Sequence, residues 1–183
     1  MEKLPLDIDK SWTLFIDRDG VINHEKKENY ILNWDEFVFY DGVKEAMELL
    51  ANTFGLIILV TNQRGVEKKL MTENDLHHIH TNMQKEIELA GGKINEIYYC
   101  TSLDNDHTNR KPNAGMAFMA KEKYNTIDFT KSIMVGNKPS DMGFGRNAGM
   151  QTVFLATTNP EVAYPHQLID FRFNDLLSFA KTV

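Results

Sequence analysis

The sequence contains only one cysteine, Cys100, so no disulfide bond can form within the chain. Structural disulfides are common in secreted proteins and rare in reducing compartments. The N-terminal segment MEKLPLDIDKSW also lacks the basic-then-apolar order of a secretory signal. We therefore predict a cytoplasmic protein.

The chain also lacks any apolar run of about eighteen residues, the length that indicates a membrane-spanning helix. Positive charge is not in excess either, because 26 acidic residues outnumber 20 lysines and arginines and give a net charge of -6. Nucleic-acid-binding faces normally cluster positive charge. We predict neither a membrane nor a nucleic acid as a partner, and we expect a monomer, which an acidic surface permits.

Internal repeats and low-complexity linkers are absent as well. The 183 residues are 42% hydrophobic and 25% charged, a composition typical of a globular chain with one core. We predict one domain, residues 1–183.

Short, nearly continuous apolar runs alternate with longer segments of helical period. Helices are expected near residues 43–52, 72–90, 114–124 and 140–147. The strand candidates are TLFID, LIILV, EIYYC, SIMVG and QTVFL. Apolar runs of this kind are typical of parallel strands covered by helices on both faces, so we predict an α/β fold.

Four polar clusters follow predicted strands, at residues 17–23, 61–65, 110–112 and 136–141. Open α/β sheets bind ligands beyond the carboxyl ends of their strands. We therefore expect the four clusters to form one site.

In the first cluster, a strand delivers Asp17 and Asp19 into a turn at Gly20. Two buried carboxylates need a neutralising cation, and Mg²⁺ prefers oxygen ligands. A simple strand-end turn uses the same residue types, so this cluster alone leaves both interpretations open.

The other clusters favour phosphate. Thr61, Asn62 and Gln63 offer hydroxyl and amide donors, whereas Arg110 and Lys111 offer positive charge. Taken alone, residues 61–65 also fit a simple loop, and residues 110–112 also fit a solvated basic pair. The cluster at residues 136–141, in VGNKPSDM, also fits a capped helix start. Their joint occurrence at four strand ends favours a phosphate site.

The order of DxDG, T-N, R-K-P and G-N-K-x-x-D resembles the haloacid dehalogenase superfamily of phosphohydrolases. Within it, FIDRDGVIN, VTNQRGV, EIYYC, RKPNAGM and MVGNKPSDM resemble the heptose-bisphosphate and histidinol-phosphate phosphatase branch. The resemblance implies a three-layer Rossmann-like core with a central parallel sheet. We expect no cap domain, because no long insertion follows either of the first two strands.

The resemblance also implies a phosphomonoesterase with Asp17 as the nucleophile of an aspartyl-phosphate intermediate. Asp19 would act as general acid and base. Thr61 and Lys111 would hold the phosphate oxygens during transfer.

By the same resemblance, Mg²⁺ would be bound by the Asp17 carboxylate, the Asp19 backbone carbonyl and Asn137, with Asp141 in the outer shell. Relatives usually carry aspartate where this chain has Asn137. We therefore expect weaker metal binding rather than loss of activity.

Arg110 would recognise the rest of the substrate, with Asn62 and Gln63 nearby and residues 23–30 at the entrance. We expect a small phosphorylated metabolite, preferably D-glycero-D-manno-heptose 1,7-bisphosphate, with histidinol phosphate as the alternative. Asn137 and an altered loop leave a catalytically impaired phosphate-binding module as an alternative of another class. Phosphotransfer to an acceptor other than water would use the same residues.

The branch commonly binds structural zinc through Cys-x-His and Cys-x-Cys before Arg-Lys. Here the corresponding positions are Cys100, Ser102, His107 and Asn109. Structural zinc requires four cysteine or histidine ligands, so we expect none.

Three histidines, His77, His78 and His80, flank the buried stripe of a predicted helix. We interpret them as side chains on a solvated face rather than as metal ligands. Cys100 is interpreted as a small core residue.

Overall fold

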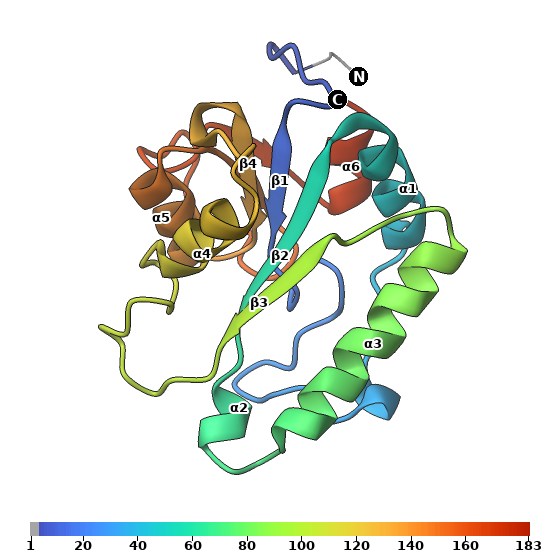
Figure 1. The fold of residues 1–183 in the computed structure, drawn as a ribbon, viewed down its shortest axis with the longest axis vertical. Helices are drawn as coiled ribbons and strands as arrows, with labels where there is room; N and C mark the ends of the chain where they lie inside the picture. The colour runs from blue at the N-terminus through green and yellow to red at the C-terminus, as the bar shows by residue number, and fades with distance from the viewer. Residues whose placement is uncertain (1–3) are drawn as a thin grey trace.

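The computed structural model describes residues 4–183, which contain one six-stranded sheet (Figure 1). Its order is β3-β2-β1-β4-β5-β6, and every neighbouring pair is parallel. The strands are β1 (Thr13–Ile16), β2 (Leu56–Asn62), β3 (Glu96–Cys100), β4 (Ser132–Gly136), β5 (Gln151–Leu155) and β6 (Phe171–Phe173). The predicted α/β class and parallel sheet are confirmed.

The helices cover both faces of the sheet. On one face lie α1 (Val43–Thr53), α3 (Glu73–Leu89) and α6 (Leu176–Ala180), and on the other lie α4 (Gly115–Lys123) and α5 (Pro139–Ala148) (Figure 1). Strand β1 serves both layers, because Leu14 and Ile16 belong to the first core and Phe15 to the second. Burial on both faces explains why the strands read as nearly continuous apolar runs.

The predicted helices α1, α3, α4 and α5 agree with the structure to within one residue at each end. The start of α3 carries a cap, in which the Thr72 hydroxyl accepts from the Asp75 backbone N–H at 3.1 Å and the Asp75 carboxylate accepts from the Thr72 N–H at 2.8 Å. Such a reciprocal pair satisfies two helix-end donors and fixes where the helix begins.

The short elements were not predicted. They are β6, α6, α2 (Arg64–Glu67) and the 3₁₀ turns η1 (Trp34–Glu36) and η2 (Phe129–Lys131). Each spans too few residues for an apolar period to show.

The interpretation of three solvated histidines is wrong for His80. His77 and His78 are exposed, but His80 is only 4% exposed and faces inward from α3. Its Nε2 lies 3.2 Å from a guanidinium nitrogen of buried Arg18. A polar partner from a distant segment makes this burial tolerable, and helical periodicity does not reveal such a partner. Cys100 is buried at 3% exposure, as predicted.

Beyond β1, the chain adds β2 and β3 on one side and β4, β5 and β6 on the other. The order therefore reverses between β1 and β4, and a ligand crevice is expected at their carboxyl ends. Within residues 4–183, no helix combines the length and apolar character needed to cross a membrane.

Candidate active site

The turn after β1, which carries Asp17 and Asp19, packs at Gly20 against Asn137, the residue that follows β4. Gly20 has a φ of +87°, and the Arg18 carbonyl accepts from the Ile22 N–H at 2.8 Å, which closes the turn. A Cβ at position 20 would lie 2.0 Å from the Asn137 side-chain nitrogen. Glycine is therefore required both by the left-handed backbone and by this close approach.

The four predicted clusters meet at one cavity of about 240 Å³. This volume is below the roughly 300–1,000 Å³ of drug-sized sites, so the cavity suits a small ligand or one end of a larger one. Its walls are formed by Asp17, Asp19, Tyr30, Thr61, Asn62, Arg64, Arg110, Lys111, Lys138, Ser140 and Asp141.

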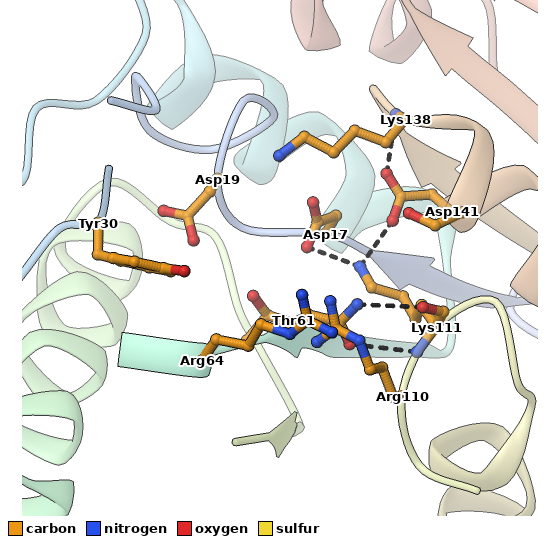
Figure 2. A pocket seen from close by; sticks show the side chains of 11 residues that line it. Asp17, Asp19, Tyr30, Thr61, Arg64, Arg110, Lys111, Lys138 and Asp141 are labelled. Carbon is orange, nitrogen blue, oxygen red and sulfur yellow. Dashed lines mark hydrogen bonds and ion pairs between the residues drawn. The ribbon is translucent and has the colours of Figure 1, made fainter. Parts of the chain in front are cut away.

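At the base of the cavity, Lys111 lies between two buried carboxylates (Figure 2). Its Nζ is 2.7 Å from Asp17 Oδ1 and 2.8 Å from Asp141 Oδ1, and it also donates to the Val60 carbonyl at 2.8 Å. Burial raises the pKa of Asp17 to about 6, against the opposing effect of Lys111. Burial acts to lower the pKa of Lys111, but the two carboxylates outweigh it and raise that pKa. Lys111 thus offsets part of the negative charge of these two buried carboxylates, which would be destabilising without a cation.

Asp141 also caps α5. Its Oδ2 accepts from the backbone N–H groups of Asn137 at 3.1 Å and Lys138 at 3.0 Å. Because both carboxylate oxygens are engaged, the orientation of Asp141 toward Lys111 is fixed.

Asp19 is surrounded by donors. Arg18 Nη2 lies 2.9 Å from each carboxylate oxygen, Asn23 Nδ2 lies 2.9 Å from Oδ1, and Gln63 Nε2 lies 2.8 Å from Oδ2. Burial acts to raise the pKa of Asp19, but Arg18 and the two amides together lower it. This environment therefore stabilises the carboxylate form.

The end of β2 supplies a hydroxyl and two amides. Thr61 is 1% exposed, and its hydroxyl accepts from Gln63 Nε2 at 2.9 Å, which leaves its own proton for an acceptor in the cavity. Asn62 exchanges hydrogen bonds with the backbone of Lys111, at 3.1 and 3.2 Å. These contacts give Gln63 and Asn62 supporting positions, and their substrate-binding role stays a prediction.

Asn137 carries a buried oxygen suited to a cation. The residue is 0% exposed, and its side-chain nitrogen donates to the Thr158 hydroxyl. Its Oδ1 is buried and has no hydrogen-bond partner among the described residues. An amide oxygen beside the turn that carries Asp17 and Asp19 provides, with their oxygens, the ligand chemistry that Mg²⁺ prefers. The residues present therefore fit Mg²⁺.

The outer part of the cavity is basic. Arg64 and Arg110 lie on the same side of it (Figure 2), and neither forms an ion pair within residues 4–183. Burial and the neighbouring charge of Arg64 lower the pKa of Arg110. Two like charges held together without a carboxylate favour an anionic ligand.

Four lining residues were not singled out from the sequence. Arg64, Lys138 and Ser140 lie within the predicted polar clusters, so the sequence pattern indicates their place in the site but not their roles. Tyr30 belongs to residues 23–30, the segment expected at the entrance, and it lines the cavity. Lys138 forms an ion pair with Glu25 of the same segment, at 2.5 Å.

Helix α2 fastens the loop that follows β3. Glu67 Oε2 accepts from the Leu103 N–H at 2.9 Å, and Arg64 donates to the Leu103 carbonyl at 3.0 Å.

Cys100 Sγ lies 3.6 Å from His107 Nδ1. Within residues 4–183, no group of three or more histidine, cysteine, aspartate or glutamate side chains is placed to hold a metal. The absence of zinc stays a prediction.

Comparisons with known proteins agree with this geometry. Residues 7–180 match the family model described as polynucleotide kinase 3 phosphatase. The chain is 37% identical over 146 residues to the D-glycero-alpha-D-manno-heptose-1,7-bisphosphate 7-phosphatase of Campylobacter jejuni, covering 80% of this chain and 83% of that protein. The chain belongs to the haloacid dehalogenase superfamily of phosphatases.

Other members of this superfamily match over most of the chain. The D-glycero-beta-D-manno-heptose-1,7-bisphosphate 7-phosphatase of Pasteurella multocida is 32% identical over 156 residues, covering 81% of this chain and 83% of that protein. The crystal structure of a D,D-heptose 1,7-bisphosphate phosphatase from B. bronchiseptica, complexed with magnesium and phosphate, has a TM-score of 0.84 at 24% identity, covering 93% and 96% of the two chains. The predicted superfamily, branch and enzyme class are confirmed, and the protein is a phosphatase.

Proposed function

We propose that this phosphatase is Mg²⁺-dependent and hydrolyses a phosphomonoester of a small, doubly phosphorylated sugar, with D-glycero-D-manno-heptose 1,7-bisphosphate as the preferred substrate. The observation that carries the proposal is the buried Asp17, bridged by Lys111 to Asp141, in one cavity with Asp19 and Thr61. Relatives named for this substrate, at 37% and 32% identity, support it.

In the first step, a carboxylate oxygen of Asp17 attacks phosphorus, and the bond between phosphorus and the sugar oxygen breaks. Asp19 donates its proton to the departing oxygen, which leaves an aspartyl-phosphate on Asp17. In the second step, water gives a proton to Asp19 and attacks phosphorus, so that inorganic phosphate leaves and the Asp17 carboxylate is restored.

The donors around Asp19 favour the carboxylate that the second step requires. A phosphate dianion in the cavity adds negative charge beside Asp19, which acts in the opposite direction and favours the protonated form needed in the first step. Thr61 and Lys111 supply the donors for the phosphate oxygens, and their burial keeps water away from them.

The ligands that we propose for the cation are Asp17, the backbone carbonyl of Asp19 and Asn137 Oδ1, which has no hydrogen-bond partner in the described part of the chain. Asp141 would lie in the outer shell. When bound, Mg²⁺ supplies positive charge that offsets the phosphate and lets an anionic carboxylate approach it. The magnesium and phosphate in the B. bronchiseptica structure are consistent with this assignment.

The two arginines distinguish between the candidate substrates. Arg64 and Arg110 face the cavity without carboxylate partners in the described part of the chain. A second phosphate would satisfy both, whereas histidinol phosphate would bring an ammonium group toward them. The arrangement therefore favours a bisphosphate over histidinol phosphate.

The test is phosphate release from heptose 1,7-bisphosphate, heptose monophosphates and histidinol phosphate, each with Mg²⁺ and with chelator. We expect the bisphosphate to give the highest kcat/KM and chelator to abolish turnover. Turnover that persists in chelator would contradict the role of Mg²⁺. If phosphate binds but no compound is hydrolysed, the protein is a phosphate-binding module instead.

The nucleophile is tested separately with Asp17→Asn. Because the amide cannot form the acyl phosphate, we expect kcat to fall by about 10³-fold or more. Asp35→Asn, which changes an exposed aspartate of η1, is the matched control and should leave kcat unchanged. Appreciable turnover by Asp17→Asn would refute the covalent mechanism.

A further inference from the structure

A second charged group is buried behind the acid/base residue. The Arg18 side chain is 0% exposed, although it belongs to the turn that lines the cavity. Its Nη2 contacts both oxygens of Asp19 at 2.9 Å, and its Nε lies 3.2 Å from Oδ1. The remaining nitrogen, Nη1, points away from Asp19 and lies 3.2 Å from His80 Nε2.

The direction of this last hydrogen bond follows from the chemistry of the two groups. A guanidinium has only donors, so His80 Nε2 must be the acceptor and the ring proton must reside on Nδ1. Burial lowers the pKa of His80 to about 3, and the adjacent charge of Arg18 acts in the same direction, so the ring is neutral near pH 7. A neutral ring provides the lone pair that Arg18 requires.

We propose that His80 is a positioning residue for the reaction: from α3, it holds the Arg18 guanidinium in the orientation that grips the carboxylate of Asp19. This rests on the proposed function, in which Asp19 is the general acid and base. His80 does not line the cavity that holds Asp17 and Asp19. Its effect reaches the reacting atoms only through Arg18.

The burial of Arg18 makes its hydrogen bond to His80 important. Without an acceptor at position 80, Nη1 would be an unsatisfied donor of a buried charge, which is costly. Arg18 can relieve that cost by rotating toward another acceptor, and this rotation breaks the two-pronged contact with Asp19. Asn23 and Gln63 still hold Asp19, so the loss should be partial and should affect proton transfer more than attack by Asp17.

Two kinds of phosphate ester separate this role from a structural one. A sugar alkoxide needs a proton from Asp19 to leave, whereas nitrophenolate leaves without one. We therefore compare kcat/KM, which covers the steps up to departure of the leaving group, for heptose 1,7-bisphosphate and for p-nitrophenyl phosphate. For His80→Leu we expect a roughly tenfold loss on the sugar ester and less than about a twofold loss on the nitrophenyl ester.

Polar variants provide the rescue test. In His80→Gln the amide oxygen can reach the position of Nε2, so kcat/KM on the sugar ester should return to within about threefold of wild type. His80→Asn is too short to reach Arg18 and should lose about as much as His80→Leu. The comparison of His80→Gln with His80→Asn holds even if His80→Leu does not fold, and thermal unfolding of each variant establishes which are folded.

His78→Leu is the control, because His78 is exposed on the same helix and, within residues 4–183, its ring forms a side-chain hydrogen bond with Asn82 alone. Equal losses on both esters in folded His80 variants, an unchanged kcat/KM, or a His80→Gln variant as impaired as His80→Asn would each overturn the proposal. If wild type hydrolyses neither ester, the proposed function itself fails; if wild type is active and the His80 variants are unaffected, only the inference fails.

Discussion

At the scale of single residues, Asn137 decides the charge of the buried cluster around Lys111. Asp17 and Asp141 share the one ammonium group of Lys111, so ionised side chains give this cluster a net charge of -1. An aspartate at position 137 would bring it to -2 in a place with 0% exposure. The amide therefore favours the metal-free fold and weakens the attraction for a cation.

The substitution Asn137→Asp should reveal both effects. We expect the free energy of unfolding in chelator to fall by about 2 kcal/mol, because a buried charge is added without a partner. We expect the Kd for Mg²⁺ to fall roughly tenfold, because a full charge replaces a dipole. Denaturant unfolding and calorimetric titration with Mg²⁺ measure the two quantities.

Asn74→Asp is the control, since Asn74 is exposed on α3 and should change neither the Kd nor the stability appreciably. An unchanged Mg²⁺ affinity in Asn137→Asp would place residue 137 outside the metal shell.

The sequence could predict that Asp17, Asp19, Thr61 and Asp141 meet, because each lies at or shortly after the end of an apolar run and parallel strands end at one edge. For Lys111, at the end of the long polar loop after β3, the sequence offers only the family resemblance. It could not predict the contacts of Arg18 and His80. Helical periodicity marks inward positions by apolar residues, and a buried polar pair leaves no such mark. Its partners are also separated by 62 positions in the chain.

At the scale of elements, hydrogen bonds join the short helix α2 to the loop after β3. Glu67 and Arg64 of α2 bind the backbone of Leu103, and the same loop leads to Arg110 in the cavity wall. Because α2 directly follows β2, this link ties a long irregular segment to the central sheet. The loop thus has a protein anchor near the region where the branch commonly binds zinc.

Glu67→Ala should loosen this loop. Losing a hydrogen bond to a charged acceptor costs roughly 1.4 kcal/mol, which corresponds to about tenfold faster amide exchange in residues 101–110. KM for the bisphosphate should rise, because Arg110 becomes less well ordered. Hydrogen exchange followed by mass spectrometry and steady-state kinetics measure the two effects.

Glu88→Ala removes an exposed carboxylate from α3 and should change neither the exchange nor KM. Unchanged protection of the loop in Glu67→Ala would show that the Leu103 contact does not hold it.

The longer elements could be predicted because apolar pattern and capping agree in them, as at the start of α3. The segment 156–170 and strand β6 could not be predicted in this way. Strand β6 is an edge strand of three half-buried residues, which depends on its pairing with β5 rather than on its own apolar pattern.

At the scale of the whole molecule, the net charge of the chain and the charge of the outer cavity differ in sign. The chain has a net charge of -6, whereas the outer cavity presents Arg64 and Arg110. A small dianion fits within the cavity that the arginines line. A long polyanion extends beyond the cavity and meets the negative net charge of the chain.

This difference predicts the behaviour of an oligonucleotide with a 3′-phosphate, a substrate raised by the description of the matching family model. We expect its kcat/KM to be at least about 100-fold below that of heptose 1,7-bisphosphate, because repulsion opposes its approach. Phosphate release under identical Mg²⁺ and salt measures the ratio. A 3′-phosphorylated mononucleoside, which lacks the polyanion, should fall between the two, and an oligonucleotide hydrolysed as well as the sugar would contradict the expectation.

The reversal of strand order between β1 and β4 has a consequence for how the chain acquires its site. Asp17 follows β1, Thr61 lies near the end of β2 and Asn137 follows β4. These three central strands are neighbours in the sheet but far apart in the chain. No contiguous fragment that stops before β4 contains both sides of the crevice. During synthesis, the cavity therefore cannot form until β4 has emerged. Its completion coincides with the pairing of β1 with β4, which are far apart in the chain, and loop-closure entropy makes such a step slow.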